Sequence, residues 1–143
     1  PQESAMEPTY SVGEKFFVNR AVYKIKSPKR GDVIVFRTSV SDDAALHIRR
    51  VIGLPGETVL IKDGQVYING KVYEENGAYP DITNAGLADS SITLESGEYF
   101  VLGDNRNNSE DSRFSDIGNI NKKYIVGKLW LTVSPKSKIG FVK

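Results

Sequence analysis

The chain has 143 residues, a net charge of +1, 39% hydrophobic residues, no cysteine and a single histidine, His47. The missing cysteines exclude a disulfide framework and a thiolate metal site, and one histidine excludes a multi-histidine metal site. The near-zero charge argues against a dedicated nucleic-acid-binding protein, and no apolar run reaches the roughly 20 residues that span a membrane. A chain of this length forms one domain, with room for a small insertion.

Short β-forming runs bounded by turn residues dominate the sequence. In chain order they cover residues 16–18, 33–36, 59–61, 66–68, 99–102 and 128–133. Asp63-Gly64 and Asn69-Gly70 suit the positive φ angles of tight hairpin turns, so residues 58–73 are predicted to form a β-meander. Helix signals are scarce, and the strongest predicts a short turn near residues 121–125. The pattern as a whole predicts a mainly β fold.

Two stretches differ from this pattern. Residues 74–96 are polar and rich in small residues, which is long for a structureless connection. They are predicted to be an inserted segment or flap, with a mobile surface loop as the alternative. Residues 117–143 carry six lysines and no acidic residue, so this part is either a solvated face or a surface that lies near an anionic membrane.

Three motifs are too specific to be scaffolding alone. They are AMEPTY at residues 5–10, the pair RGDVIVF at 30–36 and IRRVIGLPGE at 48–57, and GDNRNNSEDSR at 103–113. In the second motif Leu54-Pro55-Gly56 predicts a turn, because proline presets φ and glycine permits the positive φ that follows. In the third, Asp111 and Arg113 are predicted to form charge-assisted hydrogen bonds. Each motif alone is also compatible with a rigid turn that orders its neighbours.

Together and in this order, the three motifs resemble the type I signal peptidase family, the membrane-bound serine endopeptidases that remove signal peptides from exported proteins. The likeness runs from Met6 to about Val133. Pilus-associated proteins of Gram-positive bacteria are among the family members that the chain resembles. It implies a β fold of two antiparallel sheet regions, of the kind shared by LexA and signal peptidases. Residues 1–143 would be a single extracytoplasmic catalytic-type domain with an inserted region at about 63–98.

The resemblance also implies the setting of this domain. A membrane helix would lie ahead of Pro1, so the whole protein would be a single-pass protein of the cell membrane with this domain on the extracytoplasmic face. Its partners would be the signal peptide of an exported or pilin precursor and the membrane surface, with no nucleic acid. The family chemistry uses a serine nucleophile and a neutral lysine base, which require no metal or other cofactor.

Both reacting positions of the family pattern carry the wrong residue here. The serine immediately before the motif methionine corresponds to Ala5, whose methyl group cannot attack a carbonyl. The lysine immediately before the motif arginine corresponds to Arg49, which keeps its charge in proteins and cannot accept a proton. The resemblance assigns supporting roles to Ser109, Asp111 and Arg113, and substrate contacts to Met6, Pro8 and His47. The chain as written is therefore predicted to be catalytically inactive.

Neighbouring residues are poor substitutes for the lost pair. Ser4 adjoins Ala5, but on an extended segment it would face the opposite side. His47 would share a strand face with Arg49, and imidazole is a competent base, although a packing role is the simpler interpretation.

Two explanations for the altered pair stay open. One is an inactivated ectodomain of a working signal peptidase, with engineered replacements. The other is a natural non-catalytic relative that acts as a chaperone or scaffold in pilus assembly. A weaker third hypothesis is an anion site for lipid head groups or polymers, formed by Arg49 and Arg50.

Overall fold

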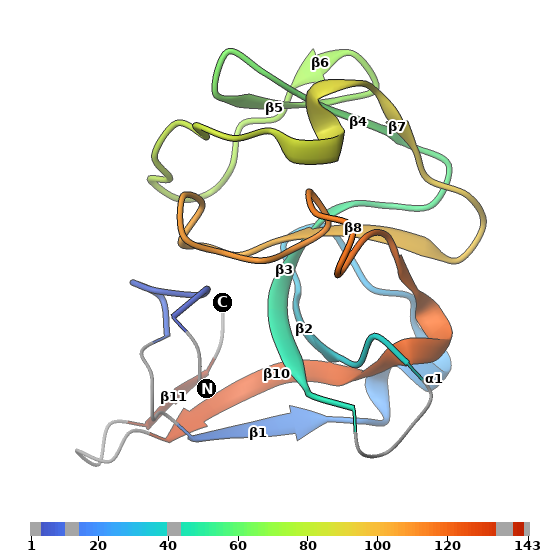
Figure 1. Ribbon diagram of the computed structural model, residues 1–143. Coiled ribbons are helices and arrows are strands. Elements are labelled where there is room, and N and C mark those ends of the chain that lie inside the picture. Colours follow the sequence, from blue (N-terminus) through green and yellow to red (C-terminus); the bar gives the residue numbers. More distant parts are fainter. Residues whose placement is uncertain (1–3, 11–14, 40–43, 134–138, 142–143) are drawn as a thin grey trace.

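The computed structural model describes residues 4–10, 15–39, 44–133 and 139–141, and within them two antiparallel sheets are stacked as two tiers (Figure 1). The larger, lower sheet has seven strands and the smaller, upper sheet has four. The predicted mainly β fold with two antiparallel sheet regions is confirmed.

The lower sheet has the strand order β1-β10-β2-β3-β8-β9, and β11 also pairs with β10. Its strands are β1 (Lys15–Asn19), β2 (Val33–Phe36), β3 (His47–Gly53), β8 (Glu98–Leu102), β9 (Ile120–Asn121), β10 (Ile125–Val133) and β11 (Ile139–Phe141). The long strand β10 links β2 to β1 within this sheet, because its first half pairs with β2 and its second half with β1. All strands predicted from the apolar runs in this sheet are present.

The upper sheet has the order β6-β5-β4-β7, formed by β4 (Thr58–Lys62), β5 (Gln65–Ile68), β6 (Lys71–Val72) and β7 (Ile92–Thr93). Asp63 and Gly64 have φ angles of 52° and 79°, and Asn69 and Gly70 have 51° and 82°. These left-handed values are what a two-residue hairpin turn requires, so the β-meander predicted at residues 58–73 is confirmed.

Residues 74–96 contain regular secondary structure, which the alternative prediction of a mobile surface loop did not include. They contain a 3₁₀ helix, η1 (Gly86–Asp89), and strand β7, which pairs Thr93 with Thr58. The turn expected near residues 121–125 is the 3₁₀ helix η2 (Lys122–Tyr124), whose N-terminus is capped by the Asn121 side chain. One helical turn was not predicted, α1 (Val22–Ile25), a four-residue element with no buried residue.

The hydrophobic core ties the two tiers together. One cluster of buried side chains joins β3 and β8 of the lower sheet to β4, β5, η1 and the segment before β8. Its members are Ile52, Val59, Ile61, Val66, Ile82, Ala88, Leu94, Phe100 and Leu102. Burial of apolar side chains on both sides of this junction stabilises the contact between the sheets.

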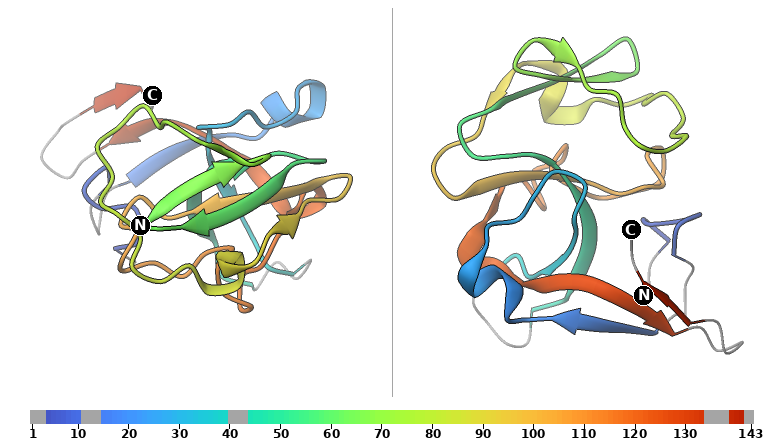
Figure 2. Two further views of the ribbon diagram at one scale, coloured as in Figure 1. Left: turned by 90° about the horizontal axis from the view of Figure 1, so that it is seen from above. Right: turned by 180° about the vertical axis from the view of Figure 1, so that it is seen from behind.

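The three helical turns of the described residues are short, and none of them has the length or the apolar character needed to cross a bilayer. Figure 2 shows the two tiers from above and from behind. In the view from behind, the segment that follows β8 lies between the upper sheet and the turn at residues 4–10. This segment is the third motif.

Candidate active site

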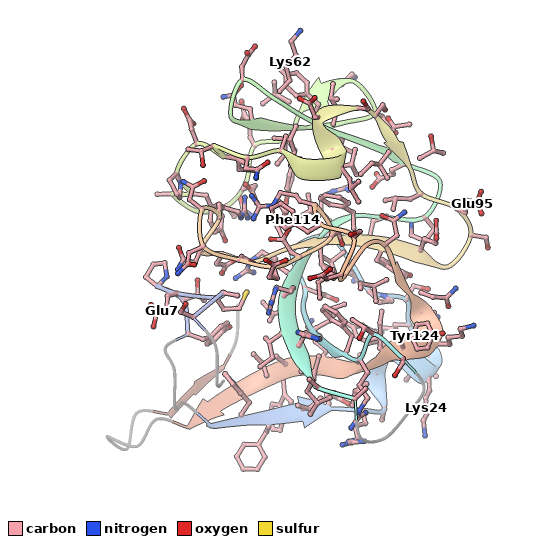
Figure 3. The ribbon with its side chains drawn as sticks, in the orientation of Figure 1. Glu7, Lys24, Lys62, Glu95, Phe114 and Tyr124 are labelled. Atoms are coloured by element: carbon pink, nitrogen blue, oxygen red, sulfur yellow. The ribbon has the colours of Figure 1, made fainter. Side chains whose placement is uncertain are left out.

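The third motif forms a loop at residues 103–113 whose charged side chains are buried. Asp104, Arg106, Asp111 and Arg113 are each at most 2% exposed. A charge removed from water needs a partner, so each of these groups must be paired within the protein. Figure 3 shows Phe114, at the end of the loop, between the two tiers.

Asp111 organises one half of the loop. Its Oδ1 accepts a hydrogen bond from Arg113 Nε at 2.8 Å, and its Oδ2 accepts one from Arg113 Nη2 at 2.9 Å. Oδ2 also accepts from the Gly103 N–H and from the Ser109 hydroxyl, both at 3.0 Å. The predicted pairing of Asp111 with Arg113 is confirmed, and it fixes the hydroxyl of Ser109 in the loop.

Asp104 joins all three motifs. Its carboxylate accepts two hydrogen bonds from Arg50, at 2.9 and 2.8 Å, and one from the Thr9 hydroxyl at 2.6 Å. Its N–H lies 3.4 Å from the sulfur of Met6. Burial alone would lower the pKa of Arg50, but the hydrogen bonds and charge of Asp104 outweigh it and raise that pKa above the ordinary arginine value. The Arg50 guanidinium is therefore already paired with a carboxylate inside the protein. This pairing weakens the hypothesis of an anion site at Arg49 and Arg50.

Arg106 connects the loop to the upper tier. Its Nε donates to the Gly103 carbonyl at 2.8 Å, and its two terminal nitrogens bind the Glu75 carboxylate at 2.8 and 2.6 Å. The ring of Tyr79 lies over the guanidinium, with 4.1 Å from Cζ to the ring centroid. Neither Glu75 nor Tyr79 was expected from the sequence, because both lie in a polar segment without a motif.

Ala5 contacts the loop through its main chain. Its side chain is buried, and its carbonyl accepts a hydrogen bond from the Asn105 N–H at 2.8 Å. Asn105 Nδ2 also donates to the Ser4 carbonyl at 3.2 Å. The nucleophile position of the family pattern therefore lies directly against the third motif.

The expectation for Ser4 was based on a wrong local structure. Residues 4–10 form turns, in which Glu7 N–H donates to the Ser4 carbonyl and Tyr10 N–H donates to the Met6 carbonyl, and the segment is not extended. In a turn, adjacent side chains do not alternate between opposite faces as they do on a strand. Ser4 and Ala5 accordingly line the same cavity.

Arg49 contacts the other end of the loop. It lies on β3, is 1% exposed, and pairs in register with Ile34. Its Nε donates to the Glu110 carbonyl at 2.7 Å and its Nη1 donates to the Ile48 carbonyl at 2.8 Å. One loop thus contacts both positions at which the family pattern places its reacting groups.

A cavity of about 390 Å³ opens beside this loop. Ala5 and Ser109 line it together with Arg113, whose Nη1 donates to the Asn84 carbonyl at 3.1 Å. The remaining lining residues are Ser4, Thr83, Asn84, Arg106, Asn107, Asn108, Glu110 and Phe114. Thr83 and Asn84 come from the segment before η1, so the upper tier supplies part of the cavity wall.

The three residues predicted to contact substrate lie in different surroundings. Met6 is 1% exposed and belongs to a core cluster with Tyr10, Val33, Val35 and Leu129. Pro8 is exposed and lines a second cavity. The His47 ring packs against Phe36 with centroids 5.6 Å apart, in agreement with a packing role. Their contact with a substrate stays a prediction.

Gly103 is required for the close approach of the loop to residue 5. A Cβ atom at this position would overlap the Ser109 hydroxyl and lie 2.6 Å from the Ala5 carbonyl oxygen. We expect Gly103→Ala to lower the free energy of unfolding by about 1–3 kcal/mol, the usual cost of overpacking. Urea denaturation measures this loss, which is due to the overlap and not to backbone strain, because Gly103 is not among the glycines with a positive φ. An unchanged stability of Gly103→Ala would contradict the close packing.

No group of three histidine, aspartate or glutamate side chains among the described residues is arranged to hold a metal ion. The site presents fixed amide, hydroxyl and guanidinium donors around a cavity of about 390 Å³. The two positions that would need a nucleophile and a base carry neither.

Comparison with known proteins gives a consistent result. The family model described as signal peptidase, peptidase S26 matches residues 2–133. Signal peptidase I P of Bacillus subtilis subsp. natto is 36% identical over 99% of this chain and 79% of its own length. A probable signal peptidase I-2 of Synechocystis sp. is 33% identical over 97% of this chain, which spans only 63% of that relative.

The fold agrees with the sequence. The crystal structure of a signal peptidase I from Enterococcus faecalis V583 superposes with a TM-score of 0.55 at 34% identity, and the match covers 73% of this chain and 98% of that one. The order of the three motifs, their meeting around one buried loop and these matches lead to one conclusion. The chain belongs to the signal peptidase family, peptidase S26.

Proposed function

We propose that this domain binds the signal peptide of an exported precursor in the cavity beside residues 103–113 and, as written, does not cleave it. The proposal rests on the intact hydrogen bonds within the loop at residues 103–113. Its supporting contacts among Gly103, Ser109, Asp111 and Arg113 are complete, although neither Ala5 nor Arg49 is able to react. An intact site without reacting groups is suited to holding a peptide.

The absence of cleavage follows from the chemistry of two side chains. Alanine has no group that attacks a carbonyl, and an arginine guanidinium has no lone pair that can accept the proton of a nucleophile. Ser4 lies in the same cavity, but its hydroxyl accepts a hydrogen bond from Asn108 Nδ2 at 3.4 Å, and an amide is not a base. Peptide binding and peptide hydrolysis are therefore separable in this chain.

The location that we propose is the extracytoplasmic face of the cell membrane, with an anchor outside this chain. Phe17 on β1 and the Trp130 side chain on β10 are 52% and 40% exposed, with ring centroids 6.3 Å apart. Exposed aromatic side chains are enriched at membrane–water interfaces, which supports a membrane-facing side of the lower sheet. We also propose that the upper sheet, which begins at β4, is the inserted region predicted at about residues 63–98.

The experiment is a binding measurement on the unaltered chain. The probe is a synthetic precursor peptide with alanine at the −3 and −1 positions relative to the expected cleavage point, titrated by calorimetry. We expect a Kd below about 100 µM and no cleavage products by mass spectrometry. Absence of binding at that concentration would contradict the proposal.

A substitution in the cavity tests whether the peptide binds there. Asn108 is exposed and lines it, so Asn108→Trp fills the space and should weaken binding by about tenfold or more. Lys62→Trp is the matched control, because Lys62 is exposed at the top of the upper tier (Figure 3). Equal changes in peptide affinity in both variants would show that the peptide does not bind in this cavity.

A specific observation also favours the second candidate, a natural non-catalytic scaffold for pilin assembly. Arg49 is fully buried and donates to two main-chain carbonyls, so the fold accommodates an arginine at this position. The codons at positions 5 and 49 of the source gene decide between the two origins. Serine and lysine codons would contradict natural loss, and alanine and arginine codons would contradict an engineered inactivation.

A further inference from the structure

A second cleft, of about 700 Å³, lies next to the candidate site. Its lining includes Pro8 and Thr9, Arg50 and Asp104, and residues 75–80. Its size is within the range of about 300–1,000 Å³ that is usual for ligand pockets. All three family motifs contribute to it, and Pro8 is the one residue of its lining to which the resemblance assigned a substrate contact.

The two cavities are close together along the segment at residues 4–10. Ser4 and Ala5 line the first cavity, and Pro8 and Thr9 line the second. The segment turns between them, so its residues cover a shorter distance than the same number of residues of an extended peptide, which advances about 3.3 Å per residue. The two cavities are therefore lined by neighbouring residues of one short segment, close enough for one extended peptide to contact both.

The part of the lining formed by residues 75–80 is held in place before any ligand binds. Glu75 and Tyr79 are fixed by Arg106, which also lines the first cavity. Gly77 makes the Tyr79 ring fit, because a Cβ at that position would lie 2.8 Å from the ring. A preformed wall lowers the entropic cost of binding a peptide.

The charges of this cleft are already paired with one another. Arg50 is bound to Asp104, and Arg30 forms two hydrogen bonds with Glu57, at 2.6 and 2.8 Å. A cleft with its cations neutralised in this way offers little attraction to a phosphate or a lipid head group. It suits an uncharged polar ligand such as the main chain of a peptide.

Two tyrosines supply the binding groups. Tyr73 and Tyr79 both line the cleft, and neither hydroxyl has a hydrogen-bond partner among the described residues. Burial raises the pKa of both phenols, so the hydroxyls remain protonated donors at neutral pH. Rings with a polar end are well suited to contact extended peptides.

We propose that the second cleft binds the residues of a precursor that follow the cleavage point, so that the domain contacts the mature part as well as the signal peptide. The inference rests on the proposed function, because it assumes that a signal peptide occupies the first cavity. It gives a non-cleaving member of the family a means of holding a whole precursor in preference to a released signal peptide.

The experiment compares two peptides on the unaltered chain. The longer one continues for about eight residues beyond the −1 alanine, and the shorter one ends at that alanine with a carboxamide, which avoids a new charge. We expect the longer peptide to bind about tenfold more tightly, because its additional residues contact the two tyrosines and add binding free energy. Equal Kd values would overturn the inference and leave the proposed function standing, whereas no binding of either peptide would remove both.

Variants assign the difference to the cleft. Replacing both tyrosines, Tyr73→Ala with Tyr79→Ala, should bring the ratio of the two Kd values to about one. Tyr124→Ala is the matched control and should keep the ratio, because Tyr124 lies at the opposite side of the lower tier from Glu7 (Figure 3). If the double variant does not fold, Gly77→Ala displaces the Tyr79 ring with a single methyl group and should reduce the ratio. An unchanged ratio in a folded variant would also overturn the inference.

Discussion

Replacing Ala5 with serine and Arg49 with lysine should convert this chain into a working endopeptidase. We expect hydrolysis of a precursor peptide to rise more than about a thousandfold above the unaltered chain, because loss of a nucleophile or its base costs at least that much. Position 49 is buried, and burial lowers the pKa of a lysine toward the neutral form that accepts the serine proton. Product formation by mass spectrometry measures the gain.

The single replacements are the controls for this experiment. Ala5→Ser alone has no base, and Arg49→Lys alone has no nucleophile, so both should stay inactive. Ser4→Ala in the double background should retain activity, because Ser4 is not the reacting serine. A folded double variant that does not cleave would show that this member has lost more than its reacting pair.

Replacing Asp111 with alanine should cause the largest loss of stability in the site. The carboxylate is fully buried and accepts hydrogen bonds from Gly103, Ser109 and Arg113. Its removal leaves the Arg113 guanidinium buried without its counter-ion, which costs about 3–5 kcal/mol. The free energy of unfolding from urea denaturation gives the value.

Two further variants separate charge burial from other effects. Asp116→Ala removes an exposed carboxylate in the same region and should change the stability by less than about 0.5 kcal/mol. Adding Arg113→Met to Asp111→Ala should recover part of the loss, since no buried charge then remains unpaired. A loss for Asp111→Ala alone as small as that of the control would mean that the pair is not buried as described.

The sequence predicted most of the fold because its local signals are strong. The dipeptides Asp63-Gly64 and Asn69-Gly70 have the required left-handed φ angles, and the apolar runs became strands. The turn at α1 was missed because none of its residues is buried, so it has no apolar face to detect. Its local signal is Asn19, whose side-chain oxygen accepts hydrogen bonds from the Ala21 and Val22 N–H groups at its start, and a single capping residue is a weak signal without a periodic apolar face.

The site was predicted in part. The pairing of Asp111 with Arg113 follows from their spacing, and the structure confirms it. The contacts of Arg106 with Glu75 and Tyr79 join residues about thirty positions apart, so no local pattern indicates them. The orientation of Ser4 was wrong because a strand was assumed where the chain turns. These tertiary contacts depend on the stacking of two sheets, which the motifs do not encode.

Ala5 joins the network of the third motif only through its carbonyl oxygen, which any amino acid provides equally. An exchange between serine and alanine at this buried position therefore leaves the hydrogen bonds of the loop unchanged. A lineage could exchange the nucleophile in one mutation and keep every ion pair around it, so that the loss of chemistry would meet no penalty in protein abundance. Catalysts and inert binders built on this fold are separated by a short evolutionary distance.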